Sequence, residues 1–202
     1  MEYSFHLYNK LAADGAAMAL DKLLNAYFYQ KNQKTKGAGT SLIDFYPTPV
    51  VVCVGSDLAI GDSLGPITGS MLKYKTQGLN VFLYGTLSSP VTAKEIKHLR
   101  AFLKETHRNS PIIAVDAAVG EKGDIGLIRL SDSPLLPGAG ANKKLGAVGD
   151  ISIMGIVAEK SMMNYGLLNT TRLNLVYSMS EIISDALSSL LWNRGGKEVK
   201  NA

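Results

Sequence analysis

Two aspartates stand where the folding of an α/β chain would bring them together, and paired carboxylates can do chemistry. Asp62 lies in a glycine-punctuated loop after an apolar strand expected at residues 50–55. Asp116 ends a second apolar strand, which is expected at residues 112–116. Parallel strands end along one edge of a sheet, and open α/β sheets bind ligands at that edge. The sequence therefore predicts two carboxylates at one ligand-binding edge.

Two carboxylates in one cleft are expected to share a single proton. Their charges repel, so the pKa of one member rises and the pair holds one proton. The ionised member can then activate water while the protonated member donates to a leaving group. Structural roles stay open beside this one. Asp62 could cap a helix expected from about Ser63 to Lys75, and Asp116 could cap the loop that follows its strand.

A metal ion is the competing use of the two carboxylates. Catalytic zinc usually takes three protein ligands, commonly with histidine among them. The chain has three histidines, His6, His98 and His107, and none of them follows Asp116. We therefore expect no metal and no other cofactor. A third ligand from the loop at residues 131–149 would instead make the site metal-dependent.

Other common motifs of catalysis or phosphate binding do not occur in the first loop. Gly55 and Gly61 do not form the G-x-G-x-x-G pattern, and no Gly-Lys-Ser/Thr follows them. A serine triad is also unsupported, because Ser56, Ser63 and Ser88 have no histidine that the sequence places as a base.

The long loop expected at residues 131–149 is the second segment of interest. Long loops inside compact domains are usually functional or disordered. Its stretch from Pro137 to Lys144 contains two glycines and two lysines. It could be a bare flexible tip. It could also cover the cleft, with its glycines approaching a peptide and Lys143 or Lys144 tuning the carboxylates or meeting an acidic substrate.

Alternating strands and helices are expected to position these loops. Apolar periodicity predicts strands at 50–55, 81–84, 112–116, 125–130 and 151–158, and helices at 11–30, 63–75, 88–106 and 171–192. This order implies an α/β fold with a mainly parallel sheet and helices on both faces. The first helix and a polar linker at residues 31–41 are expected to form an appendage on the main domain.

Composition places the chain among ordinary globular proteins. The 202 residues fit one domain, with 46% hydrophobic and 19% charged residues. No run of about 18 apolar residues occurs, so no membrane span is expected. The net charge of +4 comes without a dense Lys/Arg cluster, so nucleic-acid binding is not expected. A single cysteine, Cys53, is expected to be a buried inert thiol, and the cytosol is the expected compartment.

Three motifs in the same order resemble the sporulation protein YyaC family. They are Gly-Ser-Asp-Leu-Ala-Ile-Gly-Asp-Ser-Leu-Gly-Pro at 55–66, Ile-Ala-Val-Asp-Ala at 113–117 and Leu-Pro-Gly-Ala-Gly-Ala-Asn-Lys at 136–143. Together they span about residues 50–160. That family is similar to the spore germination protease, an aspartate-dependent endopeptidase, and more distantly to the hydrogenase maturation peptidases.

The resemblance implies roles for particular residues. The proposed catalytic pair of the germination protease maps onto Asp62 and Asp116. In the maturation peptidases the matching acids bind a metal with a later histidine, which this chain lacks. We expect the substrate cleft to be lined by residues of the first and third motifs: Gly55, Ser56, Asp57, Gly61, Pro137, Gly138, Gly140, Asn142 and Lys143.

The resemblance and the element order together imply a three-layer αβα sandwich of the phosphorylase/hydrolase-like kind. The implied function is a peptidase that acts on a protein or peptide in the cytoplasm or forespore of a sporulating bacterium. The alternatives are a non-catalytic binding or regulatory protein on the same scaffold and a metal-dependent maturation-type peptidase. Assembly into a homo-oligomer is left open. The expected divisions are a helix and linker at 1–40, the peptidase-like domain at 41–194 and a flexible tail at 195–202.

Overall fold

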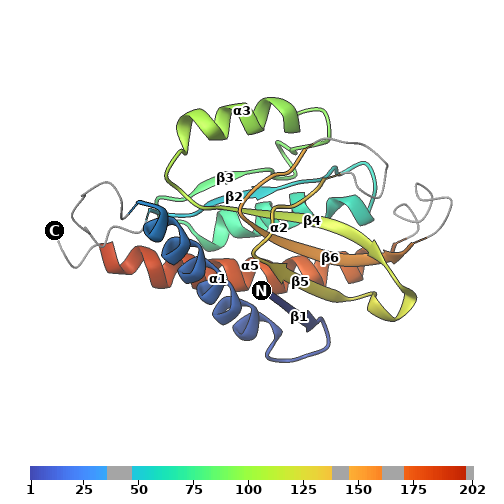
Figure 1. The fold of residues 1–202 in the computed structure, drawn as a ribbon. Helices are drawn as coiled ribbons and strands as arrows, with labels where there is room; N and C mark the ends of the chain where they lie inside the picture. The colour runs from blue at the N-terminus through green and yellow to red at the C-terminus, as the bar shows by residue number, and fades with distance from the viewer. Residues whose placement is uncertain (36–46, 138–145, 161–170, 199–202) are drawn as a thin grey trace.

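A six-stranded mixed sheet runs through the centre of the molecule, with helices on both faces (Figure 1). The computed structural model describes residues 1–35, 47–137, 146–160 and 171–198. The strand order is β1-β5-β6-β4-β2-β3. β2, β3, β4 and β6 run parallel, and β5 is antiparallel to both of its neighbours. The strands are β1 (Glu2–His6), β2 (Val50–Cys53), β3 (Phe82–Tyr84), β4 (Ile112–Gly120), β5 (Leu127–Ser131) and β6 (Ile151–Glu159).

The helices form the two outer layers. They are α1 (Ala12–Thr35), α2 (Leu64–Lys75), α3 (Ile96–Thr106) and α5 (Leu173–Glu198), with short 3₁₀ turns at Gly61–Ser63 and Lys122–Asp124. α3 covers one face of the sheet, and α1, α2 and α5 cover the other (Figure 1). The expected three-layer α/β architecture is therefore confirmed. None of the described helices is both long and apolar enough to cross a membrane.

The core explains why β2 is apolar throughout. Successive side chains of a strand point to opposite faces, so a strand covered on both faces needs no polar side. Val51 and Cys53 pack in the cluster that contains α1, α2 and α5. Val50 and Val52 pack in the cluster under α3. Cys53 is buried, and burial raises the pKa of its thiol to about 12, which suits an inert core residue.

The N-terminal segment belongs to the same sheet and core as the rest. β1, which the periodicity does not predict, pairs along its whole length with β5. α1 continues to Thr35, so residues 31–35 are helical and not part of a linker. Leu20, Leu23 and Leu24 of α1 are fully buried against the sheet and α5. At the other end of the chain, α5 extends to Glu198, beyond the expected end at Trp192.

α3 begins at Ile96, whereas the sequence predicts a helix from Ser88. Val91 instead forms a parallel bridge with Val54, and Thr86 pairs with Ser89 in a tight turn. The Thr92 N–H then donates to the Glu95 carboxylate at 2.9 Å, a contact typical of a helix start. The extended pairing beside β2 delays the helix, because residues 86–91 extend the sheet edge.

Candidate active site at the carboxyl edge of the sheet

Asp116 lies on β4, just beyond the point where the neighbouring strand β2 ends. β4 continues to Gly120, so Asp116 lies inside the strand and does not end it as the sequence predicts. The pairing of β2 with β4 ends at Cys53 and Val115. Asp116 is thus the first residue of β4 beyond the β2 ladder, and it is opposite Met154 of β6 on the other side. It therefore lies at the carboxyl edge of β2, as the argument from parallel strands requires.

Asp62 reaches the same edge from the turn that precedes α2. It occupies the middle of the 3₁₀ turn Gly61–Ser63, which packs against β4. Ser63 stands at the N-cap of α2 and makes no side-chain cap hydrogen bond. The Ser56 N–H donates to the Asp62 backbone carbonyl at 3.2 Å and closes the loop. Asp62 is thus held by the loop around it and does not occupy the N-cap position that the alternative interpretation requires.

The two carboxyl groups interact electrostatically. Asp116 is only 9% exposed, and this burial raises its pKa well above the usual range of a carboxyl group. The negative charge of Asp62 raises the pKa of Asp116 further, while the Ala117 N–H, which donates to Asp116 Oδ1 at 2.8 Å, opposes both effects. Burial also raises the pKa of Asp62, against the effect of the Ser56 N–H. Because Asp116 is the more buried, it is the better holder of a shared proton.

Two glycines allow the loop to approach the end of β2. A Cβ atom on Gly65 would lie 2.0 Å from the Val54 carbonyl oxygen. Gly55 has a φ of 140°, and a Cβ atom there would lie 2.1 Å from the Asp62 carbonyl oxygen. Only residues without a side chain fit these contacts. Glycines at positions 55 and 65 therefore allow the turn that carries Asp62 to pack closely against the sheet.

The predicted binding residues of the first loop lie around Asp62. The Gly55 N–H donates to the Val91 carbonyl at 3.0 Å, and the Ser56 N–H is used by Asp62. Ser56 Oγ accepts the Leu58 N–H at 3.2 Å. A substrate contact at Gly55 or Ser56 has to use their other atoms. Asp57 is exposed beside them, while Gly61 is buried within the 3₁₀ turn.

The predicted binding residues of the second loop are described only in part. Pro137 is buried, and it follows Leu135, which forms an antiparallel bridge with Val148. The other expected residues of this loop lie outside the described residues: Gly138, Gly140, Asn142 and Lys143, together with Lys144. Their roles in binding stay predictions.

Leu58 is a residue of this edge that motif reasoning missed. Its side chain is 90% exposed, although it is apolar and lies four residues before Asp62. An isolated exposed leucine is common on protein surfaces. The signal in the sequence was a pair of large apolar residues, Leu58 and Ile60, within a loop otherwise made of small and polar residues.

The described residues offer two carboxylates for a metal but no complete ligand set. Among residues 1–35, 47–137, 146–160 and 171–198, no group of three or more His, Cys, Asp or Glu side chains could hold a metal ion. His98 is exposed on α3, and His107 is buried, with its Nε2 2.8 Å from the Tyr84 hydroxyl. The described part of the site therefore contains two carboxyl groups, those of Asp62 and Asp116.

Comparisons with known proteins give a family, one relative and one solved structure. Residues 27–186 match a family described as a protein of unknown function (DUF1256). The uncharacterized protein YyaC of Bacillus subtilis (strain 168) is 45% identical over 139 residues, which cover 69% of this chain and 67% of that protein. The resemblance that the three motifs predict is thereby confirmed.

One solved structure with a similar arrangement is the [NiFe] hydrogenase maturation protease HycI of Thermococcus kodakarensis KOD1. The TM-score is 0.48 and the sequence identity is 18%. The match covers 71% of this chain and 92% of that chain.

Proposed function

The chain belongs to the family described as a protein of unknown function (DUF1256), and we propose that it is a peptidase whose catalytic pair is Asp62 and Asp116. The observation that carries the proposal is that the turn with Asp62 packs against β4, the strand of Asp116, so that the charge of Asp62 raises the pKa of Asp116. Perturbed carboxyl pKa values of this kind mark candidate active sites. The motif resemblance to the germination protease supports the same pair.

The unequal burial of the two carboxyls assigns them different roles in the proposed reaction. Asp62, the less buried, is ionised and accepts a proton from water as the water oxygen attacks the peptide carbonyl carbon. Asp116, the more buried, is protonated and donates its proton to the amide nitrogen as the C–N bond breaks. Proton exchange between the two carboxyls then restores the starting state.

The proposed substrate is a protein or peptide, bound along the loop that carries Asp62. The exposed Leu58 offers an apolar contact beside the pair. Asp57, exposed next to it, offers an acceptor for a backbone N–H of the substrate. We place this activity in the cytoplasm or forespore of a spore-forming bacterium, in line with the motif resemblance.

The test is cleavage of a library of bacterial peptides, with new termini identified by mass spectrometry. We expect cleavage by the unaltered protein and a loss of rate of at least about a hundredfold in both Asp62→Asn and Asp116→Asn, the low end of typical acid–base contributions. Asp14→Asn is the matched control, because Asp14 is an exposed carboxylate on α1, away from the site. Circular dichroism of each variant verifies that it is folded.

Two outcomes would contradict the proposal. Full activity in Asp62→Asn or Asp116→Asn would remove the pair from catalysis. If the unaltered protein cleaves no peptide of the library, the alternative of a binding or regulatory protein on the same scaffold is favoured.

A further inference from the structure

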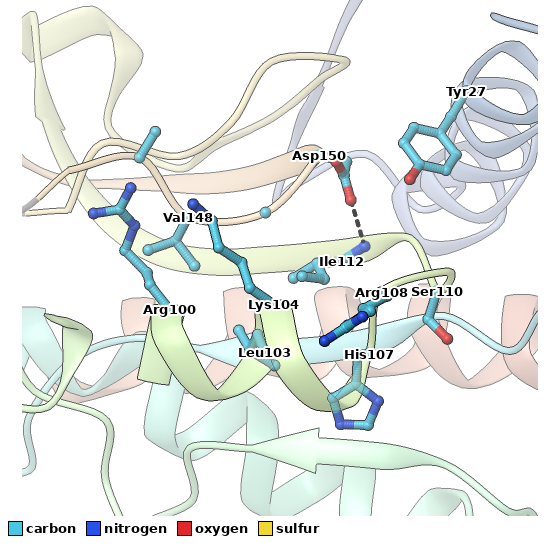
Figure 2. A pocket seen from close by; sticks show the side chains of 12 residues that line it. Tyr27, Arg100, Leu103, Lys104, His107, Arg108, Ser110, Ile112, Val148 and Asp150 are labelled. Atoms are coloured by element: carbon cyan, nitrogen blue, oxygen red, sulfur yellow. Dashed lines mark hydrogen bonds between the residues drawn. The ribbon is translucent and has the colours of Figure 1, made fainter. Parts of the chain in front are cut away.

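A pocket lies at the edge of the sheet opposite Asp62 and Asp116. It is formed by the C-terminal half of α3, the first residue of β4, residues 147–150 before β6, and Tyr27 of α1 (Figure 2). Its volume is about 320 Å³, which falls within the range of small-molecule sites. Leu103, Ile112 and Val148 supply its apolar surface. Neither of the proposed catalytic carboxyls lines it.

Three cationic side chains line one wall of this pocket. Arg100 and Lys104 are four residues apart on α3, the spacing that places helical side chains on one face, and Arg108 lies in the turn just after the helix. Arg100 and Lys104 point from α3 toward Val148 (Figure 2). The Arg100 guanidinium lies against Gly146, where a Cβ atom would be 2.2 Å from Nη1. The site thus presents one positioned guanidinium and two exposed cations.

The opposite wall carries an acceptor and a hydroxyl. Asp150 is fixed by two hydrogen bonds with Ile112: its Oδ2 accepts the Ile112 N–H at 2.8 Å, and its own N–H donates to the Ile112 carbonyl at 2.8 Å. The Tyr27 side chain approaches from α1 (Figure 2). Lys31, on the same helix, is near enough for its charge to lower the pKa of Asp150 against the effect of burial. Asp150 is the single carboxylate among the lining residues, so the lining is cationic overall.

We propose that this pocket binds a small phosphate monoester, with the phosphate on Lys104, Arg108 and Arg100 and a hydroxyl or amino group of the ligand on Asp150. A phosphate monoester carries a charge of about −1.5 to −2 at neutral pH and three acceptor oxygens, which suits a wall of several cations better than a monoanion does. Arg and Lys are the side chains that bind phosphate. The fixed Asp150 carboxylate, which would repel a bare anion, is accounted for by a donor group on the ligand.

Stabilisation of the α3 dipole explains only part of this arrangement. Cations near a helix C-terminus are favourable, and Lys104 lies in the last turn. Such cations need not face a cavity, and Lys97 of the same helix lies outside the pocket lining. Three cations around one cavity that also has an apolar surface and one fixed acceptor are what point to a ligand.

Amide chemical shifts measured by NMR test the proposal directly. Inorganic phosphate, glycerol 3-phosphate and glycerol are titrated separately into the ¹⁵N-labelled full chain at constant ionic strength. We expect saturable shifts at the amides of Ile112, Gly149 and Asp150, with a dissociation constant of about 1 mM or tighter for glycerol 3-phosphate. If glycerol 3-phosphate binds more tightly than inorganic phosphate, the proposed contact between the ligand and Asp150 is supported. If the two bind equally, the contact with Asp150 is overturned and the ligand is inorganic phosphate.

Charge variants on α3 and just after it decide whether the pocket itself binds the phosphate. Lys104→Gln and Arg108→Gln are both exposed changes and are expected to weaken binding by about tenfold each, in line with a charge-assisted hydrogen bond. Lys97→Gln removes the same charge from the same helix outside the pocket and is expected to bind as tightly as the unaltered protein. Equal affinities in all three variants, or no saturable shift at Ile112, Gly149 and Asp150, would overturn the proposal. The test is independent of peptidase activity.

Discussion

At the scale of single residues, Asp62 and Asp116 differ in how deeply their carboxyl groups are buried. Both follow apolar strands, and that pattern is enough to place them at one edge. Burial then separates them: Asp116 lies inside β4 and is 9% exposed, while Asp62 lies on a turn. The depth of each carboxyl depends on the neighbouring strands and helices, which local sequence does not specify. The donor and acceptor roles that we propose for them therefore depend on the structure.

The burial of Asp116 predicts a destabilisation that depends on pH. Its native pKa is raised above the ordinary value of 3.8. Between that value and the native pKa, the folded state holds a proton that the unfolded state lacks, so the free energy of unfolding falls as pH rises. Asn resembles the protonated carboxyl and does not titrate. We expect Asp116→Asn to raise the melting temperature at pH 7 by at least about 2 °C, which corresponds to roughly 1 kcal/mol for a chain of this size.

The measurement is a series of thermal melts between about pH 4 and pH 8, a range that begins near the unperturbed carboxyl pKa. The advantage of Asp116→Asn should be absent at the acid end and grow as pH rises. Asp14→Asn, which changes an exposed carboxyl, should follow the unaltered protein throughout. A variant no more stable than the unaltered protein at pH 7 would show that the carboxyl is well solvated or paired. A gain in stability with a loss of activity is typical of active-site residues.

At the scale of elements, the close contact between α2 and the end of β2 predicts that adding one methyl group at Gly65 lowers the stability of the fold. Gly65→Ala favours the helix by intrinsic propensity, by up to about 1 kcal/mol. The added Cβ atom would nevertheless lie 2.0 Å from the Val54 carbonyl oxygen, so backbone must move. We expect a net loss of about 1–3 kcal/mol in the free energy of unfolding, in the range of overpacked cores. Urea denaturation measures it.

The matched control is Gly123→Ala, because a Cβ atom at Gly123 has no heavy atom within 4 Å. We expect this change to alter stability by less than about 0.5 kcal/mol. A Gly65→Ala protein as stable as the Gly123→Ala protein would mean that α2 can shift away from β2 at little cost. The position of Asp62 would then be less firmly fixed than the close contacts indicate.

Element boundaries show where local sequence was sufficient and where it was not. β2, α2 and β3 form close to where apolar periodicity predicts them, because each is covered on the faces that its pattern implies. α3 starts late because Val91 pairs with Val54, a contact between segments distant in the chain. Thr92 and Glu95, three residues apart, carried the only local signal of the true start. β4 runs past Asp116 because β6 pairs with it as far as Gly120.

At the scale of the whole molecule, the N-terminal segment differs most from what the sequence predicts. An amphipathic helix followed by polar residues favours a separate appendage, yet β1 extends the sheet through β5. α1 packs along α5, and the Arg194 guanidinium joins the two helices through a 2.7 Å ion pair with Asp21. Pairing between residues 2–6 and 127–131 is a long-range contact, and no local pattern specifies it.

This integration predicts that a single core change in α1 destabilises the whole protein. Leu20 is 0% exposed and packs in the cluster that contains α2, α5 and the sheet. We expect Leu20→Ala to lower the free energy of unfolding by about 2–5 kcal/mol, the usual range for a fully buried leucine. Met18→Ala, at a 65% exposed position on the same helix, is the control and should change stability by less than about 0.5 kcal/mol.

The comparison of two probes distinguishes an integrated segment from an appendage. Trp192, the single tryptophan, lies on α5 and donates its indole N–H to the Lys75 carbonyl of α2, so its fluorescence reports on the helical layer. Far-UV circular dichroism reports on all helices. If α1 shares the core, both signals in Leu20→Ala shift together to lower urea concentration, because small single domains unfold cooperatively. An early dichroism change with an unshifted tryptophan transition would instead mean that α1 unfolds alone, as an appendage does.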